Sequence, residues 1–172
     1  MPPANPLDAL AIQNTLARYC EALDTKNWAL LAKVFAPDCR ADYPFNHSLH
    51  GASAISSAIQ NRLGPILTHH SLTTSSLVFA PDGKSATATT FFVGCHFGQG
   101  PHEGKVLQAW GRYVDVLEVQ AAKEDGDGDG DVDVDVDGSY EGVPGASGCW
   151  RIRKREVGFT KRIGDEKVMS EF

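Results

Sequence analysis

The chain has 172 residues, of which 42% are apolar, 22% charged and 9% aromatic, and its formal net charge is −6. At roughly 100 to 200 residues per domain, this length predicts a single domain, 1–172, that can bury a core. The composition excludes wholly disordered, collagen-like and disulfide-scaffold chains. No apolar run approaches the ~18 residues that a membrane span requires, so we expect no membrane partner.

The chain starts MPPANPLDALAIQ, which has neither a basic region nor a continuous apolar run and therefore does not predict a secretory signal. Its four cysteines lie far apart and without CxxC spacing, at Cys20, Cys39, Cys95 and Cys149. This spacing argues against a zinc cluster and against a disulfide framework. We expect reduced thiols, no metal site and a cytoplasmic location.

The first third of the chain predicts three helices. Asp8 is the candidate N-cap of the first, in which apolar residues recur at helical spacing through position 24. Asn27 caps a short second helix that Pro37 stops, and residues 39–45 then form a strand. Ser53 caps a third helix, which ends at residues 64–65, Gly-Pro.

The remainder of the chain predicts long strands. Residues 67–79 and 86–97 form an antiparallel hairpin around Pro81-Asp82-Gly83-Lys84, and two further strands cover 105–119 and 149–162. Helices that precede a meander of this kind indicate an α+β architecture in which a curled sheet wraps around the helices.

An acidic insert, residues 124–148, interrupts the last hairpin. Nine acidic residues and no basic one lie between Glu124 and Glu141, and the other 13 acidic residues are outnumbered by 16 Lys and Arg. Because like charges repel along it, we expect a mobile loop. Its Asp125, Asp127 and Asp129 match the start of an EF-hand loop, but Val136 occupies the position of the ligating Glu, so we do not predict specific calcium binding.

Basic residues gather near the end of the chain, interleaved with apolar ones, and this pattern indicates the solvent side of a final strand. They are Arg151, Arg153, Lys154, Arg155, Lys161 and Arg162. No nucleic-acid-binding motif accompanies them, and we expect no nucleic-acid partner.

Four polar residues are candidates for chemistry: Asp24, Tyr43, His70 and His96. Asp24 lies at the C-terminal end of the first helix, where the helix dipole raises a carboxyl pKa unless a cation or donor stands opposite. A histidine imidazole would be a suitable partner for this carboxylate. His69 and His70 must point to opposite faces of their strand, so only one of them lines the interior.

The strand that carries His96 also places Phe92 and small residues on the same face, a pattern that can border a cavity. Ordinary structural roles stay open for all four candidates. Each histidine could be a satisfied core or surface residue, Asp24 a solvated helix end, and Tyr43 a packing aromatic.

The chain contains the segment ALDTKNWALLAKVFAPDCRADY, then a Gly followed by a helix, then THHSLTTS, then a Thr-rich strand ending in CHFG. This series of segments resembles the SnoaL-like branch of the NTF2-like superfamily, with the closest likeness to scytalone dehydratases. The resemblance covers most of residues 8–119 and resumes at GCWRI. Asp24 precedes the family's Lys-x-Trp anchor, and Tyr43 closes its R-x-D-Y motif. The family's two histidines fall on His70 and His96.

The resemblance implies a cone in which a curved, mostly antiparallel sheet encloses an apolar pocket for an aromatic or polyketide-type ketone, without metal or organic cofactor. By this likeness, His70 is the general base, supported by Asp24, and returns its proton to a departing hydroxyl. Tyr43 polarises the carbonyl, and His96 holds the leaving hydroxyl or the far end of the substrate.

This sequence also departs from the family pattern. Leu23 stands where scytalone dehydratases carry a second tyrosine, and Gly111 and Tyr113 stand where they carry a pocket serine and asparagine. We expect Leu23, Trp28, Phe92 and Tyr113 to contact the substrate. The family's acid-base pair is retained while the polar contacts to the substrate differ, and this predicts a dehydratase-type lyase acting on a different hydroxylated cyclic ketone of secondary metabolism.

Two alternatives stay open, an isomerase or cyclase that uses the same base and a non-catalytic module that binds a small ligand or a protein. The resemblance also implies a homodimer or homotrimer. Val106, Trp110, Val114 and Val116 alternate on one face of their strand and could supply the contact, with Arg112 reaching its rim.

Overall fold

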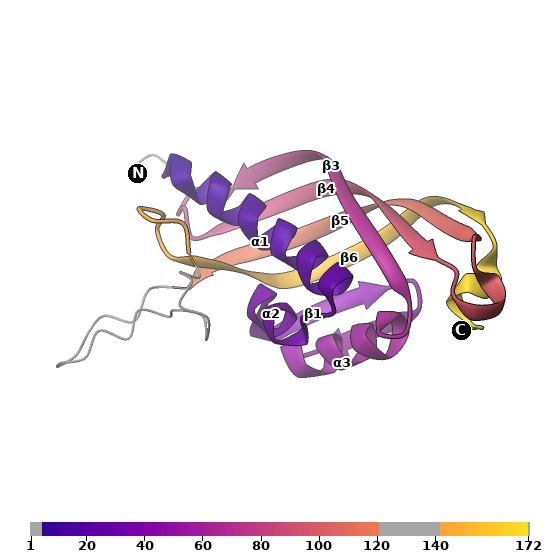
Figure 1. Cartoon of the computed structure of the whole chain (residues 1–172). Helices are drawn as coiled ribbons and strands as arrows, with labels where there is room; N and C mark the ends of the chain where they lie inside the picture. Colours follow the sequence, from indigo (N-terminus) through magenta and orange to yellow (C-terminus); the bar gives the residue numbers. More distant parts are fainter. Residues whose placement is uncertain (1–4, 121–141, 172) are drawn as a thin grey trace.

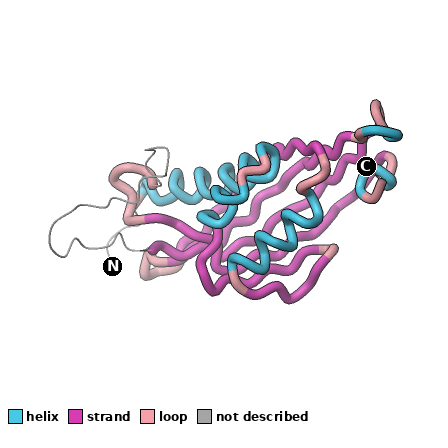
Figure 2. Tube along the Cα trace, turned by 60° about the horizontal axis from the view of Figure 1, so that its bottom comes forward, coloured by secondary structure: helices cyan, strands magenta, loops and turns pink. Residues whose placement is uncertain are grey.

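The computed structural model describes residues 5–120 and 142–171. In these residues three helices pack against a sheet of six strands, an α+β architecture. The helices lie on one face of the curved sheet (Figures 1 and 2). The helices are α1 (Pro6–Thr25), α2 (Trp28–Val34) and α3 (Ala52–Leu63), and the strands are β1 (Phe35–Tyr43), β2 (Asn46–His50), β3 (Leu67–Phe79), β4 (Ser85–Phe97), β5 (Val106–Gln120) and β6 (Cys149–Gly164). Two short 3-10 turns, η1 (Gly100–His102) and η2 (Glu166–Met169), complete these elements.

The sheet has the order β2-β1-β6-β5-β4-β3, and α1 crosses its inner face (Figure 1). Within the described residues β1 and β6 pair in parallel, and the other neighbours pair antiparallel. The core lies between the sheet and the helices and buries Ile12, Leu16, Leu31, Leu117 and Ile152. Burial of each such side chain contributes about 1.5–3 kcal/mol to folding. The predicted architecture, a mixed and mostly antiparallel sheet curved around three helices, is confirmed.

The helix caps differ in part from those predicted. Asn5, not Asp8, caps α1, because its side chain accepts a hydrogen bond from the Leu7 amide at 3.0 Å. Asp8 is buried inside the first turn, where its two oxygens accept hydrogen bonds from the amide and the hydroxyl of Ser147, each at 2.8 Å. It therefore fastens the segment before β6 to the helix. The prediction for Asn27 is confirmed, since its side chain accepts from an α2 amide.

Two further boundaries were wrong. Gly51, at φ 83°, stands at the N-cap of α3 in place of Ser53, which lies inside the helix. Helix α2 already ends at Val34, before Pro37. Pro37 lies within β1, where an irregularity in the β1–β6 register accommodates a residue without an amide hydrogen. The edge strand β2 was not predicted, because its sequence NHSLH has no apolar alternation.

Two β-bulges change which side chains of β6 face inward. The register with β5 skips one residue at Arg153 and another at Thr160. Each extra residue shifts the alternation of side chains by one position. As a result Arg155 is fully buried and Arg162 borders the interior pocket, so placing these two on the solvent side was wrong.

Several predictions concern other parts of the chain. The acidic stretch 124–141, and with it the calcium hypothesis, lies outside the described residues. The four cysteines carry free thiols. No helix in the ranges 5–120 and 142–171 is long and apolar enough to cross a membrane. The face of β5 with Trp110 and Val114 is partly exposed on the outside of the sheet, and the homodimer or homotrimer stays a prediction.

Candidate active site

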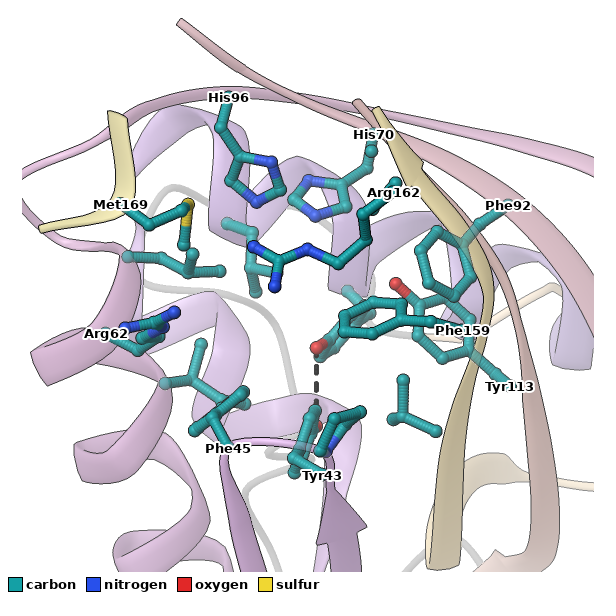
Figure 3. Close-up of a pocket in the computed structure, with 18 residues that line it drawn as sticks. Tyr43, Phe45, Arg62, His70, Phe92, His96, Tyr113, Phe159, Arg162 and Met169 are labelled. Carbon is teal, nitrogen blue, oxygen red and sulfur yellow. Dashed lines mark hydrogen bonds between the residues drawn. The ribbon is translucent and has the colours of Figure 1, made fainter. Parts of the chain in front are cut away.

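A cavity of about 320 Å³ lies between the helices and the inner face of the sheet, closed at one side by η2 (Figure 3). Its inner end is formed by three buried tyrosines, Tyr19, Tyr43 and Tyr113. His70 and His96 form one wall. The volume falls in the range of sites for small organic molecules, and the lining is mostly apolar and aromatic, as in such sites.

His70 and Asp24 meet beside this cavity, although 46 residues separate them in the sequence. The His70 Nδ1 lies 2.7 Å from Asp24 Oδ1, and the His70 amide donates to Asp24 Oδ2 at 2.6 Å. The end of α1 and the start of β3 are therefore held together through one carboxylate, which binds both the backbone and the ring of the same residue.

Neighbouring groups hold the Asp24 carboxylate in place. The Thr68 hydroxyl donates to Asp24 Oδ1 at 2.9 Å, and Lys26 Nζ donates to the Thr68 hydroxyl at 3.1 Å. Partial burial acts to raise the pKa of Asp24, but its hydrogen bonds with His70 and Thr68 and the charge of His70 outweigh burial and lower that pKa. Asp24 is therefore a carboxylate near neutral pH, opposite to what the helix dipole alone would give.

This arrangement fixes the orientation and the tautomer of His70. A carboxylate only accepts hydrogen bonds, so the Nδ1 of His70 carries a proton, and in the neutral ring the lone pair is on Nε2. The ring borders the cavity together with Gly94, where an added Cβ would lie 3.4 Å from His70 Nε2. The absence of a side chain at Gly94 thus leaves room for the ring. His69 points the other way, with 67% of its side chain exposed.

His96 lies next to His70, with 6.2 Å between ring centroids and an angle of 81° between the rings. Its Nδ1 lies 3.3 Å from the Leu107 carbonyl and donates to it. Burial, the neighbouring His70 and the charges of Arg162 and Arg62 lower the pKa of His96 to about 4, while the Leu107 carbonyl opposes this change. His96 is therefore a neutral polar group at the cavity wall.

The lowered pKa of His96 predicts a loss of stability in mild acid. Below about pH 6.5 the unfolded chain protonates His96, whereas the folded chain does so only near pH 4. The unfolded state then binds more protons, so the free energy of unfolding falls as pH falls through this window, by about 3 kcal/mol in total. Urea unfolding at pH 7.5 and at pH 4.5 measures this loss in the wild type and in His96→Asn.

The His96→Asn variant should show a smaller difference between the two pH values, because asparagine does not titrate. Asp24, with a pKa below 3.8, contributes little change above pH 4.5. An equal pH dependence in both proteins would contradict the buried, neutral state of His96.

The three tyrosines supply hydroxyl groups at the inner end of the cavity. The Tyr43 hydroxyl lies 3.3 Å from that of Tyr19, and the Tyr113 ring stacks on Phe92 with centroids 4.3 Å apart. Burial raises the pKa of all three phenols, so they remain protonated and can donate hydrogen bonds.

A buried ion pair stands behind the tyrosines. The Arg155 Nε and Nη2 donate to the two oxygens of Asp115 at 2.7 and 2.8 Å, and neither side chain is exposed. The Arg155 guanidinium lies 4.0 Å from the ring centroid of Tyr19 and 4.3 Å from that of Tyr113. It therefore packs against both rings, which also contact each other edge to face, and places a positive charge next to the tyrosines.

Most of the predicted site residues line the cavity, but two do not. Tyr43, His70 and His96 line the cavity, as do the expected substrate contacts Leu23, Phe92 and Tyr113, whereas Asp24 lies behind His70. Trp28 does not line the cavity. It begins α2 and packs half-buried against the core, beside Gly64 at the C-terminal end of α3.

Several cavity residues were not predicted. Tyr19 lies on the same helix as Asp24, and its apolar spacing identified it only as a core position. Arg62 and Arg162 belong to no motif in the sequence. The inward position of Arg162 depends on β-bulges that cannot be predicted from the sequence pattern. In the ranges 5–120 and 142–171 no group of three or more His, Cys, Asp or Glu could hold a metal ion.

Fold and site together define an α+β protein of the open-cone type with a His–Asp pair at an enclosed pocket. A sequence model of the SnoaL-like domain matches residues 6–156, and the chain therefore belongs to the SnoaL-like domain family. The comparison with curated proteins gives no significant match.

Solved structures share this fold at low sequence identity. A candidate scytalone dehydratase of Novosphingobium aromaticivorans DSM 12444 is 20% identical with a TM-score of 0.65, over 91% of this chain and 86% of that one. A type 2 hexachlorocyclohexane dehydrochlorinase is 14% identical with a TM-score of 0.68, over 92% and 88%. A Mycobacterium tuberculosis protein of unknown function is 20% identical with a TM-score of 0.64, over 91% and 79%.

Proposed function

We propose that this protein is a lyase of the dehydratase type that removes water from a hydroxylated cyclic ketone by acid-base catalysis, without a cofactor. The observation that carries the proposal is the orientation of His70, whose Nδ1 is hydrogen-bonded to Asp24 while its ring borders an apolar cavity. Two of the similar structures carry names that denote eliminations, a dehydratase and a dehydrochlorinase.

In the first step His70 Nε2 takes a proton from the carbon next to the carbonyl. The C–H electrons move toward the carbonyl oxygen, and the imidazolium that forms is stabilised by the Asp24 carboxylate. Because the ring is already held by Asp24, no reorientation is needed. Positioned acid-base catalysis of this kind contributes roughly 10²- to 10⁴-fold in rate.

The tyrosines act on the carbonyl oxygen. Their phenols remain protonated, so Tyr43, aided by the adjacent Tyr19, donates a hydrogen bond as negative charge develops on that oxygen. The guanidinium of Arg155 packs against the rings of Tyr19 and Tyr113, and its pairing with Asp115 holds it in this position.

The second step expels the hydroxyl group on the neighbouring carbon. The enolate electrons re-form the carbonyl and the new C=C bond, the C–O bond breaks, and the His70 imidazolium gives its proton to the departing hydroxide, which leaves as water. His96, neutral and next to His70, accepts a hydrogen bond from the leaving group through its Nε2. His70 returns to its starting state.

A panel of cyclic β-hydroxy ketones tests this proposal. We expect the wild-type protein to convert at least one of them to a product that is lighter by one water, as measured by mass spectrometry, and His70→Ala to give none. A double-bond shift without loss of mass would instead indicate an isomerase with the same base. Binding without any chemical change across the panel would indicate a ligand-binding module.

A further inference from the structure

Two arginines line the pocket beside its exposed aromatic residues. Arg62 comes from the last turn of α3 and Arg162 from β6, and the exposed rings of Phe45 and Phe159 stand beside them. In Figure 3 the Arg162 side chain extends from the β6 wall past the two histidines, toward the side of the pocket that carries Arg62. Two positive charges thus stand where a ligand would enter.

The proposed dehydration assigns no step to these charges, since His70 transfers the protons and the tyrosines donate to the carbonyl oxygen. Their inward position is nevertheless specific. The bulge at Thr160 shifts the alternation of β6, and without it Lys161 and Ile163 would share the inner face instead of Arg162. Bulges often re-aim side chains beside active sites.

Negative charge at this end of the pocket is scarce. Among the described residues no Asp or Glu lines the cavity, and no carboxylate pairs with Arg62, whose guanidinium lies 5.9 Å from the Phe45 ring centroid. Arg162 pairs with Glu166 at 2.7 Å, but the Glu166 side chain is 61% exposed and lies outside the cavity lining. One positive charge therefore has no matching carboxylate in this part of the chain.

Both cations act on the interior of the pocket, because the charges of Arg162 and Arg62 contribute, after burial and His70, to the low pKa of His96. An uncompensated positive potential in a cleft with apolar walls attracts anions. Guanidinium groups bind carboxylates through paired, charge-assisted hydrogen bonds.

We propose that the ligand of this pocket carries a carboxylate, which Arg62 and Arg162 bind while its ring system occupies the apolar interior. If the proposed function is added, the substrate is a hydroxylated cyclic keto acid whose reacting carbon faces His70. Only this identification of the substrate rests on the proposed function. Glu166 then competes with the substrate carboxylate for Arg162 and is displaced when the substrate binds.

Binding of 2-naphthoate and of its methyl ester tests the proposal without any turnover. The two probes have the same ring system and differ in charge. We expect calorimetry to show tighter binding of the acid to the wild-type protein, by roughly tenfold or more, since hydrogen bonds between charged groups are stronger than those to a neutral ester. The double variant Arg62→Gln/Arg162→Gln should lose this preference and keep its affinity for the ester.

Two further variants sharpen the result. Glu166→Gln should tighten binding of naphthoate severalfold, because it removes the competing carboxylate. Arg112→Gln removes an exposed arginine from the outer face of β5 and serves as the matched control, which should leave both affinities unchanged. Thermal unfolding confirms that each variant is folded.

Equal affinity for acid and ester, or a preference that survives in the double variant, would overturn the carboxylate proposal. These outcomes are independent of the dehydratase proposal, because neither probe is a hydroxy ketone. A protein that prefers the acid but fails to dehydrate any keto compound would retain the carboxylate site and lose the proposed reaction.

Discussion

His70→Ala is expected to lower kcat on any substrate found by roughly 10²- to 10⁴-fold, because it removes the group that takes and returns the proton. Its effect on thermal stability should be small by comparison, since the ring borders a cavity and Asp24 keeps its hydrogen bonds to the His70 amide and to Thr68. Asp24→Asn should cause a similar loss. An amide can donate to His70 Nδ1, which would move the proton to Nε2 and abolish the base.

His50→Ala is the matched control, because His50 lies exposed on the edge strand β2 and should leave kcat unchanged. Steady-state kinetics and thermal unfolding of the three variants and the wild type provide the comparison. Retained turnover in His70→Ala together with a large loss of stability would make His70 a structural residue and remove the basis of the proposed mechanism.

Asp115→Ala is expected to have the largest effect on stability. It leaves the fully buried Arg155 guanidinium without its carboxylate, and breaking a buried ion pair in this way costs about 3–5 kcal/mol. The decrease should appear as a lower urea midpoint at pH 7. Arg155 also packs against Tyr19 and Tyr113, so the variant should disturb the tyrosine end of the pocket as well.

Removal of an exposed ion pair provides the comparison. Glu156→Ala breaks a pair with Lys154 on the solvent side of β6, next to Arg155 in sequence, and should shift the midpoint very little. Replacing both buried partners with apolar residues should recover much of the loss in Asp115→Ala, because no unpaired charge remains. Comparable effects of Asp115→Ala and Glu156→Ala would contradict the importance of the buried pair.

The sequence predicts those elements whose pattern depends on local chemistry. The strand over 67–79 has the predicted bounds, because a helix-ending Gly-Pro precedes it and a Pro-Asp-Gly turn follows it. The opposite orientation of His69 and His70 likewise follows from strand geometry alone. Asn27 caps α2 for the local reason that a short side-chain acceptor reaches the first free amides.

Features that depend on long-range pairing were not predictable. The bulges in β6 arise from its register with β5, and they reversed the expected orientation of Arg155 and Arg162. Asp8 was misassigned because its partner, Ser147, lies 139 residues away. The contact between Asp24 and His70 was expected from the family resemblance, since no local pattern brings the end of a helix to a particular strand residue.

The assignment of His70 as a general base is tested most directly by hydrogen exchange at the carbon next to a carbonyl. In D₂O, with α-tetralone as a ketone that has no leaving group, NMR follows loss of the α-proton signal. We predict that the wild-type protein accelerates this loss well above the buffer rate and that His70→Ala does not. Exchange in His70→Ala as fast as in the wild type would contradict the account.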